Sequence, residues 1–229
     1  PSLGRRNLII NGGHVIDQRN GGASVATSSG GSAFVTDRWA IYYDATSKVS
    51  VEQNQGSVTP PVGFSNYLGA TSLSAYTIGA SERIAFQQTI EGFNGSALAW
   101  GTTDAKTATL SFWVRCSLTG TFGGSLRNGS SGTPSYPFTY SISSANTWEH
   151  KTVTITGPTT GSWDSTNGGF VQVWLSLGAG ASVSGTAGAW AGSTLFSATG
   201  ATSVVGTNGA TFQFTGVQLE VGSVATPFE

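Results

Sequence analysis

The chain closes with the stretch Val217-Gln218-Leu219-Glu220-Val221-Gly222-Ser223-Val224-Ala225-Thr226-Pro227-Phe228-Glu229. From Val217 to Val221, apolar residues alternate with polar ones, which is the period of a β-strand with one buried face. Pro227 has no N–H to donate to a neighbouring strand, so the strand must end before it. The stretch therefore predicts a closing strand followed by a stop.

Segments of similar character recur along the chain, separated by turn-forming residues. The expected strands cover residues 7–11, 34–44, 48–53, 83–91, 108–118, 136–142, 149–156, 169–177 and 212–221. The best helix candidate, residues 94–100, is long enough for a turn or two. Many short strands with little or no helix predict an all-β fold, a jelly-roll β-sandwich of two antiparallel sheets. No domain boundary is visible, so residues 1–229 are expected to form a single β-sandwich domain.

The composition restricts the classes of partner. Charged residues make up 9% of the 229 residues, with a net charge of −1, whereas an average chain carries about 25% charged residues. Nucleic-acid binding needs a basic surface, so no nucleic-acid partner is expected. No apolar run approaches the ~18 residues that span a bilayer, so no membrane insertion is expected. Cys116 is the only cysteine and is expected to be a buried structural thiol.

One segment, residues 178–209, is rich in glycine, alanine, serine and threonine. A flexible linker would have this composition, but Trp190, Leu195 and Phe196 interrupt it. We therefore expect an ordered excursion that these three side chains fix to the core. In a jelly roll, the first and last strands would lie close together.

The closing stretch resembles a signature of bacteriophage tail-fibre and other virion domains, Gln-Leu-Glu-x-Gly-x-x-Ala-Thr-Pro-Phe-Glu. Other segments resemble the same family in the same order, namely Asn7-Leu8-Ile9-Ile10-Asn11-Gly12, Thr36-Asp37-Arg38-Trp39, Leu110-Ser111-Phe112-Trp113-Val114-Arg115 and Ala189-Trp190-Ala191-Gly192. Asp17-Gln18-Arg19 departs from the family's Trp-Gln-Arg-Gly, so no contact is carried over at that position.

The resemblance implies a sandwich similar to carbohydrate-binding modules, carried on a virion as part of a longer protein. It implies a tail-fibre domain that binds host cell-surface polysaccharide for attachment, beside other virion proteins and as a homo-oligomer, a trimer. The alternative is a purely structural virion module, such as a fibre trimerisation tip or a capsid decoration, that binds no ligand.

The seven tryptophans are the best lead to a ligand site, because an exposed ring can cover the C–H face of a sugar. Trp39, Trp113 and Trp174 lie in strand-like patterns and are expected in the core. Trp163 lies in a polar loop, where burial explains less. It is therefore the first candidate for a ligand contact.

Three further residues complete the predicted ligand-binding set. Tyr136, between two prolines, is a second aromatic residue expected in a loop. Asp164 and Asn167 share the loop of Trp163 and offer polar contacts. The same oxygen-rich loop could supply some ligands to calcium, although an ordinary polar turn is the favoured interpretation. No other cofactor or metal site is predicted.

No catalytic residues are predicted, and the chain is expected not to be an enzyme. A glycosidase needs two carboxylates facing one cleft, and the sequence shows no recognised spacing for them. The carboxylates have structural interpretations instead. Asp37 is expected to pair with its neighbour Arg38, and Glu220 with Arg38 or Arg115. A depolymerase remains the third functional hypothesis.

Overall fold

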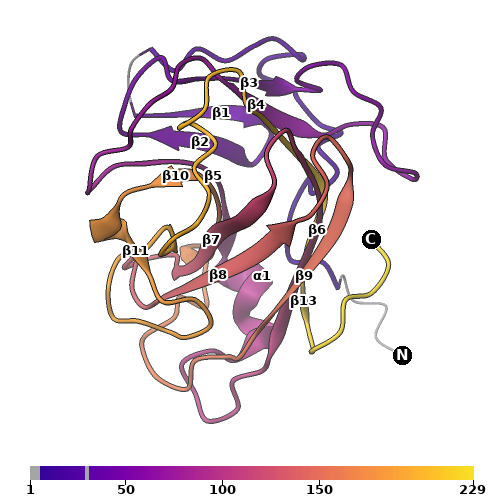
Figure 1. Cartoon of the computed structure of the whole chain (residues 1–229). Helices are drawn as coiled ribbons and strands as arrows, with labels where there is room; N and C mark the ends of the chain where they lie inside the picture. Colours follow the sequence, from indigo (N-terminus) through magenta and orange to yellow (C-terminus); the bar gives the residue numbers. More distant parts are fainter. Residues whose placement is uncertain (1–5, 29–30) are drawn as a thin grey trace.

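The computed structural model describes residues 6–28 and 31–229, which fold into two packed antiparallel sheets (Figure 1). The six-stranded sheet has the order β1-β2-β5-β10-β7-β8, with bounds Ser32–Thr36, Trp39–Tyr43, Arg83–Glu91, Gly169–Ala179, Gly120–Asn128 and Ser135–Ile142. The five-stranded sheet has the order β3-β4-β13-β6-β9, with bounds Val49–Gln53, Leu68–Ser72, Thr211–Val221, Ala108–Cys116 and Glu149–Ile155. The predicted all-β jelly-roll sandwich of two antiparallel sheets is confirmed.

Helical structure is short. The elements are α1 (Gly92–Gly95) and two 3₁₀ turns, η1 (Ser96–Leu98) and η2 (Ala181–Val183). Within the described ranges, no helix has the length and apolar character that crossing a membrane requires.

A single cluster of apolar side chains fills the space between the sheets. Phe86 and Ile41 from the six-stranded sheet meet Phe112, Phe214 and Leu219 from the other, and all five are fully buried. Each buried side chain of this size stabilises the fold by about 1.5 to 3 kcal/mol. Cys116 is buried as predicted, and burial raises the pKa of its thiol to about 11.

Several predicted strand boundaries are wrong. Residues 34–44 are a hairpin of β1 and β2, because Arg38 adopts a left-handed backbone (φ +74°) and reverses the chain. The predicted strands do not include β4 or β7. Packing explains a glycine in β7, because a Cβ on Gly124 would lie 2.4 Å from the Phe138 ring. Residues 7–11 form no strand, although the Leu8 N–H donates to the Leu219 carbonyl over 2.8 Å. The two ends therefore do lie together.

The closing strand, β13, is buried on both faces rather than one. Val217 and Leu219 enter the core, but Gln218 and Glu220 on the opposite face are also inaccessible (0% and 2% exposed). Among the described residues, Glu220 forms no ion pair with Arg38 or Arg115, so that prediction is wrong. Its carboxylate accepts hydrogen bonds from Gln218 Nε2 and from the N–H and hydroxyl of Thr226, each over 2.8 Å. The tail folds back and provides these donors itself.

The excursion of residues 178–209 is ordered, as predicted. Two of its residue pairs form the short parallel strands β11 (Ser184–Gly185) and β12 (Ser197–Ala198). Phe196 packs edge-on against Trp174, with ring centroids 4.8 Å apart, on the outer face of the six-stranded sheet. The guanidiniums of Arg83 and Arg127 lie 4.3 and 4.1 Å from the same Phe196 ring. The excursion thus covers the β10-β7-β8 half of this face and leaves the β1-β2-β5 half open.

Candidate functional site

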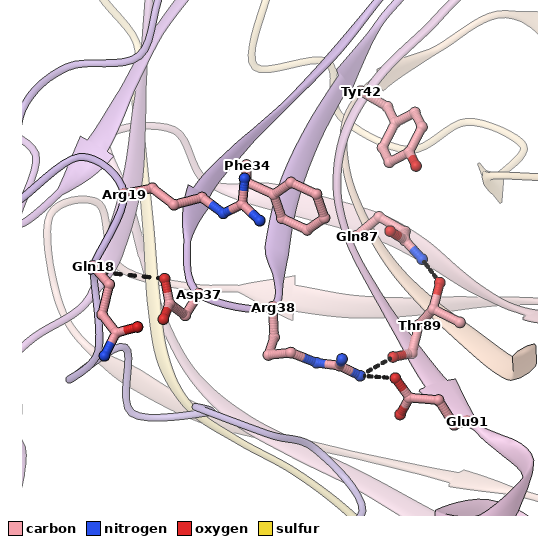
Figure 2. Close-up of a pocket in the computed structure, with 9 residues that line it drawn as sticks. All are labelled: Gln18, Arg19, Phe34, Asp37, Arg38, Tyr42, Gln87, Thr89 and Glu91. Carbon is pink, nitrogen blue, oxygen red and sulfur yellow. Dashed lines mark hydrogen bonds and ion pairs between the residues drawn. The ribbon is translucent and has the colours of Figure 1, made fainter. Parts of the chain in front are cut away.

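The open half of the six-stranded sheet holds a groove of about 570 Å³, which we call the β5 groove (Figure 2). Its lining residues come from β1, β2, β5 and the turns beside them, and they are Gln18, Arg19, Phe34, Asp37, Arg38, Tyr42, Gln87, Thr89 and Glu91. A volume of this size lies within the range of about 300 to 1,000 Å³ that small-molecule sites occupy.

Two aromatic rings stand at the sides of the β5 groove. Phe34 on β1 is 48% exposed, and the Arg19 guanidinium lies 4.9 Å from its ring. Tyr42 on β2 is half-buried and packs against Trp174 with ring centroids 5.0 Å apart. Ala40 lies in register with both Phe34 and Gln87, so a small side chain separates the taller ones. The result is an open channel with apolar walls.

Polar groups line the β5 side of the groove, as Figure 2 shows. Gln87 Nε2 donates to the Thr89 hydroxyl over 2.5 Å, and the side-chain oxygen Oε1 of Gln87 has no hydrogen-bond partner among the described residues. The Arg38 guanidinium donates to the Thr89 carbonyl (3.2 Å) and to the Glu91 carboxylate. These planar amide and guanidinium groups can recognise ligand hydroxyls.

The charges in the β5 groove favour binding over acid catalysis. Burial raises the pKa of Glu91, but the hydrogen bonds from Arg38 and from the Glu91 backbone, the charge of Arg38 and a hydrogen bond from Asn94 together outweigh burial and lower the pKa overall. Glu91 therefore stays ionised at neutral pH. A general acid would need a raised pKa.

Asp37 does not pair with Arg38, so that expectation is wrong. The Asp37 carboxylate accepts a hydrogen bond from the Gln18 N–H over 3.2 Å, whereas Arg38 reaches across to Glu91 on β5. The two neighbours diverge because the positive φ at Arg38 turns its side chain toward the sheet.

The sequence-predicted residue Trp163 lies in an aromatic cluster beyond the groove. Its ring meets those of Trp100, Phe170 and Trp190 with centroids 5.1 to 5.5 Å apart. Its indole N–H donates to the Thr160 carbonyl over 3.3 Å. Trp163 is half-buried and packs against the core, so much of the ring serves packing. Its role as a ligand contact stays a prediction.

Tyr136 lies on β8, not in a loop as predicted. Its side chain points into the sandwich, is 6% exposed, and packs against Trp190 with ring centroids 5.3 Å apart. Trp190 therefore contacts both Tyr136 and Trp163, which brings the two predicted aromatic residues to one cluster. Little of Tyr136 is accessible to a ligand.

Asp164 and Asn167 lie in the loop before β10. Asp164 Oδ1 accepts hydrogen bonds from the N–H and hydroxyl of Thr166, over 2.6 and 2.8 Å, so the loop closes on itself. Asn167 is exposed. No three histidine, cysteine, aspartate or glutamate side chains of residues 6–28 and 31–229 gather in a way that would hold a metal ion.

We expect Trp163→Ala to lower the free energy of unfolding by about 2 kcal/mol, because it removes three ring contacts from a half-buried site. Chemical unfolding followed by circular dichroism measures this. The matched variant Phe93→Ala removes an aromatic ring that is 71% exposed and should change stability by less than about 0.5 kcal/mol. Equal effects of the two variants would contradict a packing role for Trp163.

The β5 groove is not among the sequence-based predictions, because its aromatic residues lie on strands and not in loops. A usable signal lies in β5, where Gln87, Thr89 and Glu91 alternate with other residues and so share one face. Two outward aromatic residues on the neighbouring strands, Phe34 and Tyr42, complete the pattern. Which of these faces stays uncovered depends on the path of residues 178–209.

The tryptophans predicted to be in the core divide into three cases. Trp39 is fully buried between the sheets, as predicted. Trp174 is buried too, but on the outer face, under the excursion. Trp113 is only partly buried and faces outward from β6, so that prediction is wrong.

Comparisons with known proteins relate the chain to others by fold. No protein-family model matches the chain, and no curated protein matches its sequence. The enzymatically active domain of tailspike protein 4 from bacteriophage CBA120 has a similar structure, with a TM-score of 0.51, 14% identity and coverage of 94% of this chain. This chain spans only 21% of that tailspike chain.

Two other solved structures are similar over their whole length. One is a protein from Bacteroides thetaiotaomicron VPI-5482 that is named as a sugar-binding protein. It aligns with a TM-score of 0.54 and 11% identity over 95% of this chain and 100% of its own. TmCBM61, solved in complex with β-1,4-galactotriose, aligns with a TM-score of 0.47 and 9% identity over 95% of this chain and 100% of its own. At these identities the likeness concerns the fold alone.

Proposed function

We propose that this chain is a non-catalytic carbohydrate-binding domain of a phage virion, which holds a host cell-surface polysaccharide in the β5 groove. The observation that carries the proposal is the groove itself, in which Phe34 and Tyr42 flank polar groups of β5. Aromatic rings that lie beside hydrogen-bonding groups fit the alternating C–H faces and hydroxyls of sugars.

The phage context of the proposal has two supports. The closing residues Gln218–Glu229 resemble a signature of tail-fibre domains, and the fold is similar to that of a tailspike domain. Attachment through a shallow groove would be weak for one copy, and several copies on one fibre would strengthen it through avidity. A trimeric assembly with other virion proteins is part of this proposal.

Loss of the groove aromatics should weaken glycan binding. We expect Phe34→Ala and Tyr42→Ala each to lower the affinity for a bound polysaccharide about tenfold, because each removes about 1.4 kcal/mol or more of ring contact. Calorimetric titration with polysaccharide purified from candidate hosts measures this. Phe93→Ala is the matched control, since its exposed ring lies outside the groove.

The same titration tests the loop predicted from sequence. If Trp163→Ala abolishes binding while Phe34→Ala and Tyr42→Ala do not, the ligand lies at the loop and the β5 groove is not the site. If all three variants bind as the wild type does, the proposed attachment function through either site is wrong.

The alternative is a purely structural virion module. Val15 and Ile16, which are 64% and 48% exposed, lie beside the C-terminal Phe228 and would suit a contact between subunits. Light scattering, which measures the oligomeric state, distinguishes the structural module from the binding domain. An obligate trimer that Val15→Ser and Ile16→Ser dissociate, without any glycan binding, would favour the structural role.

A further inference from the structure

A second groove lies on the opposite side of the sandwich, on the outer face of the five-stranded sheet. It also measures about 570 Å³, and the residues that line it are Val62, Gly63, Phe64, Ser111, Trp113, His150, Gly216, Ala225, Thr226, Pro227 and Phe228. We call it the tail groove, because the C-terminal tail forms one of its walls. In Figure 1 this tail, in yellow, emerges beside the sheet of β6, β9 and β13.

Trp113 in the tail groove differs from every other tryptophan in its hydrogen bonding. In the other six tryptophans the indole N–H donates a hydrogen bond to an oxygen atom of another residue. These are Trp39, Trp100, Trp148, Trp163, Trp174 and Trp190. The Trp113 N–H has no such acceptor within the described part of the chain, and its ring is partly exposed. A donor left free beside a groove is available to a ligand.

His150 supplies a second free polar edge. It lies opposite Trp113 in the register of β6 and β9, with ring centroids 5.3 Å apart. Neither of its ring nitrogens has a hydrogen-bond partner among the residues that the structure describes. Partial burial and the charge of Lys151 lower the pKa of His150, so at neutral pH the imidazole offers one donor and one acceptor.

The apolar wall of the tail groove is built around a bulge in β13. The register shifts between Thr215 and Gln218, and Gly216 adopts a left-handed backbone (φ +62°). A Cβ on Gly216 would lie 2.5 Å from the Phe64 ring, so glycine is what lets Phe64 pack onto the sheet. Phe228 then packs edge-on against Phe64, with ring centroids 5.1 Å apart.

The lining of the tail groove carries no permanent charge, in contrast to the β5 groove with its two arginines and two carboxylates. An anionic or cationic ligand would find no partner there. An uncharged ligand with alternating C–H faces and hydroxyls matches both the phenyl rings and the free N–H groups.

We propose that the tail groove is a second saccharide site, which takes an uncharged pyranose with its C–H face on Phe64 and Phe228 and its hydroxyls on the Trp113 N–H and His150. This site goes beyond the attachment function proposed for the β5 groove, because it lies on the other sheet and selects for neutral sugar units. A single polysaccharide that reaches both grooves would gain avidity from a single domain.

The two histidines make a clean test. His150 lies in the tail groove, and His14 is fully buried in the core. We expect millimolar maltotetraose, cellotetraose or β-1,4-galactotriose to shift the NMR signals of the His150 imidazole and the Trp113 indole N–H, while the signals of His14 stay in place. Trp113→Phe assigns the indole signal and should weaken binding about tenfold, through the loss of one hydrogen bond to the ligand.

Variants separate the two sites. Phe34→Ala and Tyr42→Ala should leave the His150 shifts unchanged, and Trp113→Phe should leave binding at the β5 groove unchanged. If none of the three sugars shifts the His150 signals, or if the shifts vanish in the β5 groove variants instead, the tail groove is not a saccharide site. Shifts at His150 without any effect of the β5 groove variants on polysaccharide affinity would overturn the proposed attachment site alone.

Discussion

Acidification from pH 6.5 to pH 3 is expected to lower the free energy of unfolding by about 4 kcal/mol through His14 alone. His14 is fully buried, with its ring 4.9 Å from that of Phe214 and 5.3 Å from that of Trp39. Its Nδ1 lies 3.3 Å from the Thr36 hydroxyl, and its Nε2 is buried without a partner within residues 6–28 and 31–229. Burial lowers the pKa of His14 from 6.5 to about 3.

The direction follows from proton binding in the two states. Below pH 6.5 the unfolded chain protonates His14, whereas the folded chain does not until about pH 3. Each unit of pH lost within this window therefore favours the unfolded state, and the stabilisation is complete only above pH 6.5. Urea unfolding at pH 7, 5 and 3.5 measures the loss.

His14→Asn isolates the contribution of His14. Asparagine does not titrate and tolerates the left-handed backbone at this position (φ +53°). The variant should be less stable at pH 7, but its free energy of unfolding should fall less steeply in acid, because it lacks the His14 imidazole. The carboxylates are the same in both proteins, so the difference between the two acid dependences reports His14. His150→Asn should keep most of the acid dependence. An unchanged acid dependence in His14→Asn would contradict the assignment.

Glu220→Ala should lower the free energy of unfolding by about 3 kcal/mol at pH 7. The substitution removes the acceptor of three hydrogen bonds, one from the buried Gln218 amide and two from the half-buried Thr226, and unsatisfied buried groups cost about 1 to 3 kcal/mol. Burial raises the pKa of Glu220, but the hydrogen bonds from Thr226 and Gln218, together with the charge of Arg6, outweigh it and lower the pKa. The carboxylate is therefore the form that holds the tail.

Glu229→Ala is the matched control for Glu220→Ala. The Glu229 carboxylate also accepts a hydrogen bond, from Arg6 over 2.7 Å, but this ion pair is exposed. Exposed pairs contribute about 0 to 1 kcal/mol, so this variant should be close to the wild type in thermal and urea unfolding. Equal losses in the two variants would mean that the tail is not held through Glu220. Glu220→Ala should also loosen the Thr226 wall of the tail groove and weaken saccharide binding there.

The local pattern of apolar and polar residues was sufficient to predict much of the sheet structure. Strand β5 (Arg83–Glu91) matches the predicted bounds, and the ordered excursion follows from its three apolar side chains. Local pattern failed where tertiary packing decided the residue. Gly124 looks like a strand breaker, but its lack of a side chain makes room for Phe138.

The candidate site was harder to predict than the fold. The polar or proline-rich sequence around Trp163 and Tyr136 indicates loops, yet both rings pack around Trp190. The groove residues Phe34 and Tyr42 lie on strands whose two faces look equally apolar in sequence. Only the path of other segments shows which face is open.

The sequence by itself determined the all-β class, the alternation that sends Val217 and Leu219 into the core, and the end of the closing strand before Pro227, because these depend on backbone geometry within a few residues. The tertiary structure alone decided that Glu220 binds the chain's own tail, that Trp113 and the β5 groove stay open, and that His14 is buried. These outcomes depend on which distant segment covers each sheet face. Coverage is a property of the folded chain as a whole, and no local period encodes it.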